Sequence, residues 1–185
     1  MQGRNETVEL IERLARLVFN DGHSRGLKPA QWEALRYLSR ANRFSRTPGA
    51  LTAYLGSTKG TVSQTVMSLE RAGLVEKAAN PADRRSVHLD LTPAGVALLE
   101  TDGLTRVAQA VDGLPEAVRG GLEAGLRTVL ARRLAASGGR AFGICGDCRH
   151  FERDAGGRGH HFCRLLHQPL GGEDAAQICY EQEAA

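Results

Sequence analysis

The spacing of apolar residues changes near residue 73, and this change constrains the fold more than any other feature of the 185-residue sequence. Before it, apolar residues recur every three or four positions in segments bounded by threonine, proline and glycine, a pattern typical of short amphipathic helices. After it, Val87, Leu89 and Leu91 alternate with polar residues, which predicts a strand with one apolar face. Short helices that lead into a two-stranded hairpin indicate a winged helix-turn-helix.

The breaks in these patterns predict the bounds of each element. We expect helices at residues 5–20, 29–41, 48–55, 58–72, 93–112 and 116–135, and strands at residues 74–77 and 87–91. Gly22 and Gly26 are expected to end the first helix. Thr47, Ser57 and Thr92 are expected to cap later ones, because a hydroxyl oxygen can accept an unpaired N–H of the first turn. The expected fold class is mainly α with a small β hairpin, namely a winged helix-turn-helix with a helical dimerisation region and a short C-terminal tail.

Charge is distributed unevenly along the chain. Residues 1–92 carry 14 basic and 9 acidic side chains, whereas residues 93–185 carry 10 basic and 12 acidic ones. The basic N-terminal half indicates an anionic partner such as nucleic acid. No run of about 18 apolar residues and no N-terminal apolar segment is present, so we expect no membrane partner and a cytoplasmic location.

The segment 58–72 can offer a polar face to a ligand. If Val62, Val66 and Leu69 point inward, the opposite face carries small hydroxyl and amide side chains, which suit close contact with base edges and phosphates. Gly60 would let the backbone approach, and a helix N-terminus favours an anion. The alternative is an ordinary solvated helix face. The candidate DNA-binding residues are Ser57, Thr58, Lys59, Thr61, Ser63, Gln64, Thr65 and Ser68, together with Arg84 and Arg85 at the hairpin tip.

Several linked motifs carry a resemblance to a known family. They are Pro29-Ala30-Gln31-Trp32, Leu51-Thr52-Ala53-Tyr54-Leu55-Gly56, Thr61-Val62-Ser63-Gln64, Leu69-Glu70-Arg71-Ala72-Gly73-Leu74-Val75, Asp83-Arg84-Arg85 and Leu91-Thr92-Pro93-Ala94-Gly95. With these motifs, residues 29–95 resemble the MarR family of winged-helix transcription regulators. The resemblance implies a homodimer, the segment 58–72 in the major groove, and Arg85 in the minor groove with Asp83 orienting it. One departure is Lys28, where the family often has a serine or threonine cap, so the helix that follows is expected to start less firmly.

The long apolar stripes agree with a homodimer. Those at residues 7–18, 96–111 and 118–130 are larger than a small core needs. We therefore expect an N-terminal dimerisation helix, a winged-helix DNA-binding domain, C-terminal dimerisation helices and a cysteine-rich extension, at residues 1–26, 27–92, 93–136 and 141–185. Two-fold related helices would read a pseudo-palindromic operator in double-stranded DNA, with half-sites about 10 base pairs apart. A repressor is the first functional hypothesis.

All four cysteines follow residue 144, at the spacing C-x2-C-x14-C-x15-C: Cys145, Cys148, Cys163 and Cys179. About 40 residues cannot easily bury a core of their own, and metal ligation is the usual remedy. The C-x2-C start, the early aromatic residue and the two isolated later cysteines resemble the ligand pattern of high-potential iron–sulfur proteins. We favour a [4Fe–4S] cluster held by all four thiolates, with a four-thiolate zinc site as the alternative.

Other interpretations of the cysteines and of the whole chain stay open. The cysteines could form a thiol–disulfide switch or be unrelated, and a histidine could replace one of them as a ligand: His150, His160, His161 or His167. A thioredoxin-like site lacks its strand–helix context, and no motif indicates an enzyme. A metal or redox sensor would act through the dimerisation helix that precedes the tail. The remaining hypotheses are a regulator with a structural zinc tail and a small organic effector, and a small redox or electron-transfer protein.

Overall fold

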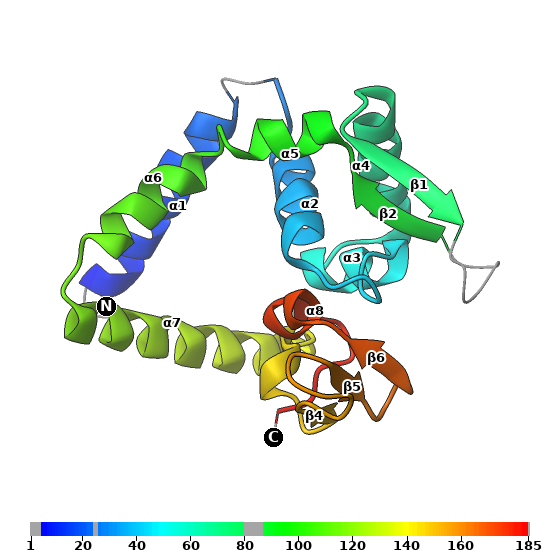
Figure 1. Ribbon diagram of the computed structural model, residues 1–185. Coiled ribbons are helices and arrows are strands. Elements are labelled where there is room, and N and C mark those ends of the chain that lie inside the picture. Colours follow the sequence, from blue (N-terminus) through cyan, green and yellow to red (C-terminus); the bar gives the residue numbers. More distant parts are fainter. Residues whose placement is uncertain (1–4, 24–25, 80–86, 185) are drawn as a thin grey trace.

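The computed structural model describes residues 5–23, 26–79 and 87–184, and its mainly helical architecture confirms the expected fold class (Figure 1). The winged-helix core consists of α2 (Pro29–Arg40), α3 (Pro48–Leu55), α4 (Lys59–Arg71) and the antiparallel strands β1 (Val75–Ala79) and β2 (Val87–Leu91). A helical arm extends to one side; it contains α1 (Glu6–His23), α6 (Gly103–Asp112) and α7 (Glu116–Ser137), and α5 (Pro93–Leu99) joins it to β2. Within these ranges no helix is both long and apolar enough to cross a membrane.

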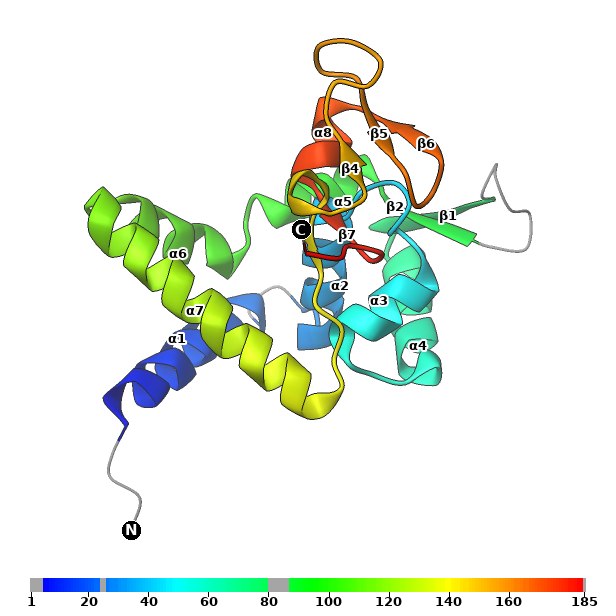
Figure 2. The same cartoon turned by 90° about the horizontal axis from the view of Figure 1, so that it is seen from below.

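The C-terminal extension consists of short elements packed below the winged helix (Figures 1 and 2). Its elements are β3 (Gly143–Ile144), a 3-10 turn (Cys145–Asp147), β4 (Phe151–Glu152), β5 (His161–Cys163), β6 (Gln168–Leu170), α8 (Gly172–Ala176) and β7 (Ile178–Cys179). Strands β3 and β7 pair with each other, and β4, β5 and β6 form a second antiparallel sheet. Strands of two or three residues provide few hydrogen bonds, so this unit depends on contacts other than its own ladders.

One apolar core joins α2, α3, α4 and the hairpin. The predicted α4 stripe is buried, with Val62, Val66 and Leu69 each at most 3% exposed. Leu89 of β2 is also fully buried, but Val87 is 38% exposed because it lies at the end of the strand remote from the core. The apolar periods therefore predicted the faces that bury, although not how far along β2 the core extends.

Threonine caps set the starts of three helices. The Oγ1 atoms of Thr47 and Thr92 accept the N–H groups of Ala50 and Gly95, as predicted. The predicted cap of α4 was wrong, because Thr58 and not Ser57 accepts a first-turn N–H, that of Thr61, at 3.2 Å. The N–H of Ser57 instead bonds the Thr52 carbonyl, so Ser57 still belongs to the turn that ends α3.

A glutamine compensates for the missing cap of α2. The side chain of Lys28 makes no cap bond, but its N–H donates to Gln31 Oε1 at 2.7 Å. The Gln31 amide nitrogen then donates to Ser68 Oγ on α4 at 2.9 Å. The start of α2 is therefore held firmly and is tied to α4.

Two predicted helix bounds were wrong. α1 continues through Gly22 to His23, and the expected helix at residues 93–112 is divided into α5 and α6. The division has a clear cause at Asp102, which caps α6 by accepting the Leu104 N–H. The same carboxylate is 7% exposed and accepts two hydrogen bonds from the Arg36 guanidinium, at 2.5 and 2.6 Å. A buried carboxylate is costly unless it is paired in this way. The break between α5 and α6 lets Asp102 cap α6 and bond Arg36 at the same time.

Gly95 provides a test of the packing between α5 and the hairpin. A Cβ atom there would lie 2.2 Å from the Leu74 carbonyl oxygen, so we expect Gly95→Ala to destabilise the fold by about 1–3 kcal/mol or more. Gly49, in the first turn of α3, has no atom within 4 Å of such a Cβ, and Gly49→Ala should leave stability unchanged or slightly raised. Urea unfolding of both variants measures the difference, and equal midpoints would contradict the packing.

Candidate nucleic-acid interface and four-cysteine site

The outer face of α4 presents polar side chains to solvent. Of the predicted DNA-binding residues on and before this helix, all are exposed except Ser57 and Thr65, which are half-buried. The side chains of Lys59, Ser63 and Gln64 make no hydrogen bond to any other described residue, so their polar side-chain atoms are available to a ligand. The face carries the basic side chain of Lys59 and otherwise neutral ones, since no acidic residue occurs between Lys59 and Leu69.

Other predicted residues on this face are used within the protein. The hydroxyls of Thr58 and Thr61 lie 2.9 Å apart at the cap, and Thr65 Oγ1 donates to the Thr61 carbonyl. Ser68 accepts from Gln31, as described above. These four residues therefore shape and hold α4, whereas the free donors and acceptors come from its first two turns. The predicted wing residues Asp83, Arg84 and Arg85 lie outside the described residues.

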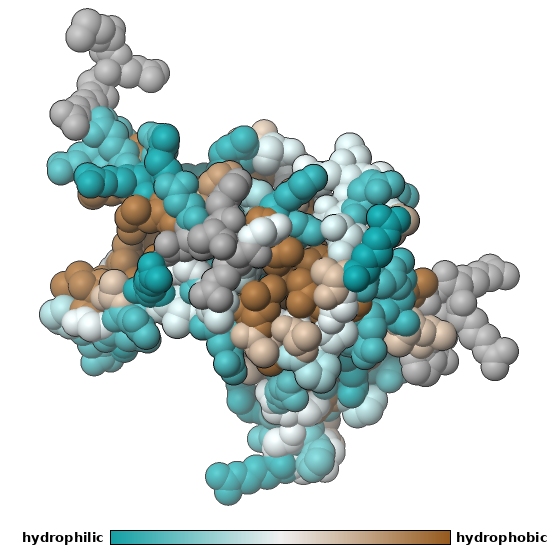
Figure 3. All heavy atoms as spheres, turned by 90° about the horizontal axis from the view of Figure 1, so that it is seen from above, coloured by the Kyte–Doolittle hydropathy of each residue, from teal (hydrophilic) through white to brown (hydrophobic). Residues whose placement is uncertain are grey.

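The helical arm carries a large exposed apolar surface (Figure 3). α7 has no buried residue, and α1 is exposed along almost its whole length. Solvent reaches at least 40% of each of the following side chains: Val8, Leu10, Ile11, Leu14, Leu17, Val118, Leu122, Leu126, Val129 and Leu130. Contiguous apolar surface of this kind on a folded chain marks an interaction site.

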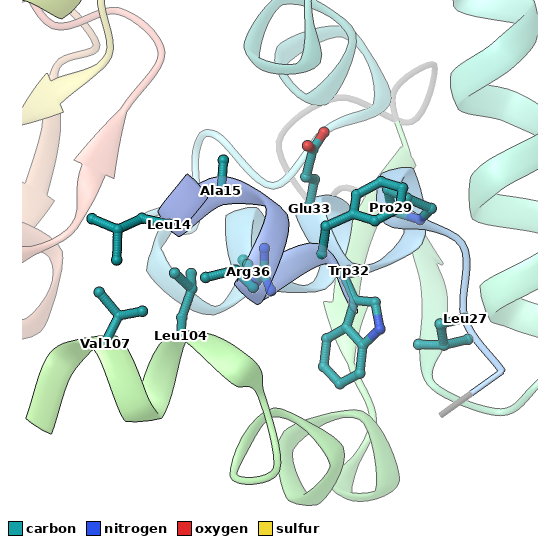
Figure 4. A pocket seen from close by; sticks show the side chains of 11 residues that line it. Leu14, Ala15, Leu27, Pro29, Trp32, Glu33, Arg36, Leu104 and Val107 are labelled. Carbon is teal, nitrogen blue, oxygen red and sulfur yellow. The ribbon is translucent and has the colours of Figure 1, made fainter. Parts of the chain in front are cut away.

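A pocket of about 360 Å³ lies where the arm meets the winged helix (Figure 4). Its walls are mainly apolar and come from α1, α2 and α6, with Leu14, Trp32 and Leu104 among the lining residues. Glu33 and Arg36 supply charge at its edge. The sequence did not reveal this pocket, because its walls come from three segments that meet only in the folded chain.

All four predicted metal ligands line one small cavity in the C-terminal extension. Cys145 directly follows β3, and Cys179 lies in β7, so the pairing of these two strands brings the two cysteines together. The pairing of β4 with β5 places Cys163 opposite Phe151. Cys145 and Cys179 are each 5% exposed, and Cys148 and Cys163 are half-buried. Of the four histidines considered as substitutes, only His150 lines the cavity.

The cysteine sulfurs accept hydrogen bonds from several parts of the chain. Asn42 Nδ2 donates to Cys145 Sγ at 3.2 Å, and the Leu166 N–H lies 3.5 Å from Cys163 Sγ. A hydrogen bond from the Cys145 thiol lowers the pKa of Cys179 although burial opposes this shift, and bonds from Asn42, the Glu181 N–H and the Ser45 hydroxyl also lower it. The same bond and burial raise the pKa of Cys145. Metals bind cysteine as the thiolate, and these hydrogen bonds stabilise that form at Cys179.

The donor set fits a metal that prefers sulfur, but the arrangement does not enclose a single ion. Four thiols with N–H donors around them match the chemistry of iron–sulfur and zinc–thiolate sites. Among the described residues, no three His, Cys, Asp or Glu side chains are arranged to hold one metal ion. The cavity volume is about 10 Å³, close to that of one water molecule, so a bound group would require the ligand side chains to adjust.

Sequence reasoning missed the winged-helix residues that complete the cysteine site. Asn42, Phe44 and Ser45 lie between α2 and α3, and Phe44 packs against the buried cysteines. Asn42 is 103 positions from the cysteine that it contacts. The sequence around Phe44 is otherwise polar, which predicts a turn there but does not identify the residues that the turn contacts.

Comparison with known proteins agrees with this fold. A MarR family model matches residues 25–86, which include most of the winged helix. A solved MarR family transcription regulator is 25% identical with a TM-score of 0.54, over 71% of this chain and 87% of that one. A mutant of S. aureus MepR bound to an oligodeoxyribonucleotide is 21% identical with a TM-score of 0.50, over 68% and 94%.

S. aureus MepR bound to ethidium bromide is similar to the same degree, with 22% identity and a TM-score of 0.50 over 68% of this chain and 92% of that one. No curated protein matches the chain. The family model and the solved structures converge on one architecture. The chain therefore has the winged-helix fold of the MarR regulators, and its residues 25–86 carry the sequence pattern of that family.

Proposed function

We propose that the protein is a homodimeric, DNA-binding transcription regulator of the MarR type that acts as a repressor. The observation that carries this proposal is the exposed face of α4, on which the side chains of Lys59, Ser63 and Gln64 have no hydrogen-bond partner among the described residues. A helix with small polar side chains can enter a major groove, where Gln reads an adenine edge and Lys neutralises a phosphate.

The start of α4 supports close approach to a phosphate backbone. Its first-turn N–H groups favour an anion, and a Cβ atom on Gly60 would meet only Thr58 Oγ1, at 3.9 Å. The glycine is therefore not needed for packing inside the chain. A requirement that the DNA backbone come near it explains its presence in a helix, where it costs about 1 kcal/mol relative to alanine.

A second copy of the chain is the proposed cover for the apolar arm. The exposed stripes of α1 and α7 lie on the same arm, so one partner can bury both (Figures 1 and 2). A two-fold dimer would present its two α4 helices to two major grooves about one helical turn apart, as a pseudo-palindromic operator requires. Arg84 and Arg85 of each wing would add backbone or minor-groove contacts, with Asp83 orienting Arg85.

The four cysteines are the proposed ligands of a [4Fe–4S] cluster, with zinc as the alternative. A zinc ion needs its four sulfurs about 2.3 Å from one point, whereas a cluster holds its ligands farther apart. The sulfurs line one cavity, and the C-x2-C start followed by two isolated cysteines resembles a cluster ligand pattern more than a zinc site with two C-x2-C pairs, which favours the cluster. A bound cluster would supply one-electron redox chemistry, and Cys145, Cys148, Cys163 and Cys179 would hold it.

The pocket between α1, α2 and α6 favours a second input, a small organic effector. Its volume of about 360 Å³ falls in the range of small-molecule sites. The charge of Arg36 is already paired with Asp102, so apolar walls with Glu33 among the lining residues suit an aromatic cation. The ethidium-bound MepR structure gives such a ligand a precedent in this fold. Because the pocket contacts both the arm and α2, its occupant would bias the angle between them.

DNA recognition by α4 can be tested with one glutamine. We expect Gln64→Ala to weaken binding to a duplex selected by the wild-type protein about 5–150-fold, since a bidentate base contact is worth about 1–3 kcal/mol. The affinity for random duplex should hardly change. Gln168→Ala, the same change at an exposed position of the tail, serves as the control in fluorescence anisotropy titrations. Equal losses in both variants would contradict base reading by α4.

The dimer can be tested with a charge on the α7 stripe. We expect Leu126→Glu to produce a folded monomer, because the side chain is 46% exposed in the single chain but would be buried against the partner. Ala131→Glu places the same charge on the opposite face of the helix, by its 3.6-residue period, and should remain dimeric. Sedimentation velocity measures both, and a dimeric Leu126→Glu variant would refute this interface.

The metal is tested by purification without oxygen. We expect a brown protein with broad visible absorption, and loss of that absorption in a Cys145→Ser, Cys148→Ser double variant. A colourless wild-type protein with one zinc per chain would overturn the cluster and support the alternative. Unchanged metal content in the double variant would refute ligation by these cysteines.

A further inference from the structure

We infer that Asn42 is a hydrogen-bond donor to the metal-binding sulfurs, and that through it the state of the four-cysteine site is linked to the position of the helix-turn-helix. The inference rests on the proposed function, because it assumes both DNA binding and a metal at the cysteines. It assigns to the turn between α2 and α3 a role that the sequence did not indicate.

Asn42 is fully buried and contacts the extension with both side chain and backbone. Its Nδ2 atom donates to Cys145 Sγ at 3.2 Å, and its N–H donates to the Ile178 carbonyl at 2.9 Å. Ile178 precedes Cys179, and Ala41 forms a bridge to the same strand. A residue of the DNA-binding unit therefore lies directly behind two of the four cysteines.

The neighbouring Ser45 fixes the turn from its other side. Its N–H donates to Asn42 Oδ1 at 3.0 Å, and its Oγ accepts the Tyr180 N–H at 2.8 Å. Its carbonyl accepts the Tyr37 hydroxyl at 2.6 Å, and Ser45 is only 1% exposed. Two residues later Thr47 caps α3, the first helix of the helix-turn-helix, so a shift of the turn moves the start of that helix.

The strength of the Asn42–Cys145 bond depends on the state of the sulfur. A metal ligand must be a thiolate, and a hydrogen bond to a charged acceptor is about twice as strong as one to a neutral acceptor. Metal loading would therefore strengthen the hydrogen bond from Asn42 to Cys145, and loss of the metal would weaken it, so the turn responds to the state of the site. By linkage, any effect of the metal on DNA affinity is matched by an equal effect of DNA on metal affinity.

This connection is more direct than the expected one through the dimerisation helix. Gly138, in a left-handed conformation, caps the C-terminus of α7, and residues 139–142 lead from it to β3 of the extension. The turn at residues 42–45, in contrast, contacts the extension by hydrogen bonds at Cys145, Ile178 and Tyr180. The winged helix therefore provides part of the surroundings of the sulfurs.

The test compares Asn42→Ala with Arg43→Ala in the full-length, metal-loaded protein. Arg43 also joins the extension, by a hydrogen bond to the Pro169 carbonyl and an ion pair with Asp174, but it touches no sulfur. In competition with EDTA, we expect the metal affinity of Asn42→Ala to be about 10–100-fold lower than that of wild type. This is the usual effect of removing a residue that hydrogen-bonds to a metal ligand. Arg43→Ala should retain its metal like wild type.

DNA affinity provides the second measurement. The ratio of affinities of the metal-loaded and metal-free forms for the selected duplex should differ from one in wild type and approach one in Asn42→Ala. Ser45→Ala serves as the second variant where Asn42→Ala does not fold, because it removes the hydroxyl near Cys179 and leaves Asn42 in place. It should change both readouts in the same direction.

The outcomes separate this inference from the proposed function. Wild-type metal retention in both Asn42→Ala and Ser45→Ala would overturn the hydrogen-bonding role, and equal DNA affinity of loaded and metal-free wild type would overturn the link. Absence of DNA binding by either wild-type form would overturn the regulator, while metal retention would still test Asn42. Absence of bound metal in wild type would overturn the inference and leave the DNA-binding proposal standing.

Discussion

The buried turn at residues 42–45 forms hydrogen bonds between the winged helix and the C-terminal extension, next to the apolar contacts that Phe142, Ile178 and Tyr180 make with the winged-helix core. Asn42 and Ser45 are almost inaccessible to water, and within the described residues no buried side-chain polar atom lacks a hydrogen-bond partner. Burial of polar groups is costly unless they are paired, so this turn is stable only with the extension in place. The turn also determines where α3 begins. The geometry of the helix-turn-helix therefore depends on the C-terminal extension, whose Cys145 is 103 positions from Asn42.

The helical arm is constrained in a different way. Its contacts with the winged helix are concentrated near Arg36 and Asp102, a largely buried ion pair that also caps α6. Removal of one partner would leave an uncompensated charge, which is more damaging than loss of the pair as a whole. The rest of the arm carries exposed apolar stripes along α1 and α7. The arm therefore has a fixed point of attachment and a surface whose burial needs another chain, a combination in which dimer geometry can be transmitted to the winged helix.

Local patterns predicted what is local in this structure. The apolar period located α2, α3, α4 and the hairpin, and threonine followed by proline located two caps, because those features depend on residues within one turn. The error at residues 93–112 arose where a distant partner decides, as Arg36 does for Asp102 across 66 positions. The error at Ser57 is local, because Ser57 and Thr58 are both able to cap and the Ser57 N–H bonds the Thr52 carbonyl at the end of α3. The spacing of the four cysteines predicted that they would converge, and they line one cavity. Their hydrogen-bond donors Asn42 and Ser45 come from another unit, and no spacing rule identifies them.

Both proposed inputs contact α2, at opposite ends. The pocket touches Pro29 and Trp32 in the first half of the helix, whereas the cysteine site contacts Ala41 and Asn42 just beyond its last residue. The contacts continue to the wing, because Arg46 donates to the Ala41 carbonyl, accepts the Leu89 N–H at its own carbonyl and pairs with Asp90 of β2. A 12-residue helix is about 18 Å long and rigid, so displacement at either end tilts the whole element. α2 is thus an element through which an effector and a metal would both alter the spacing of α4 and the wing on DNA.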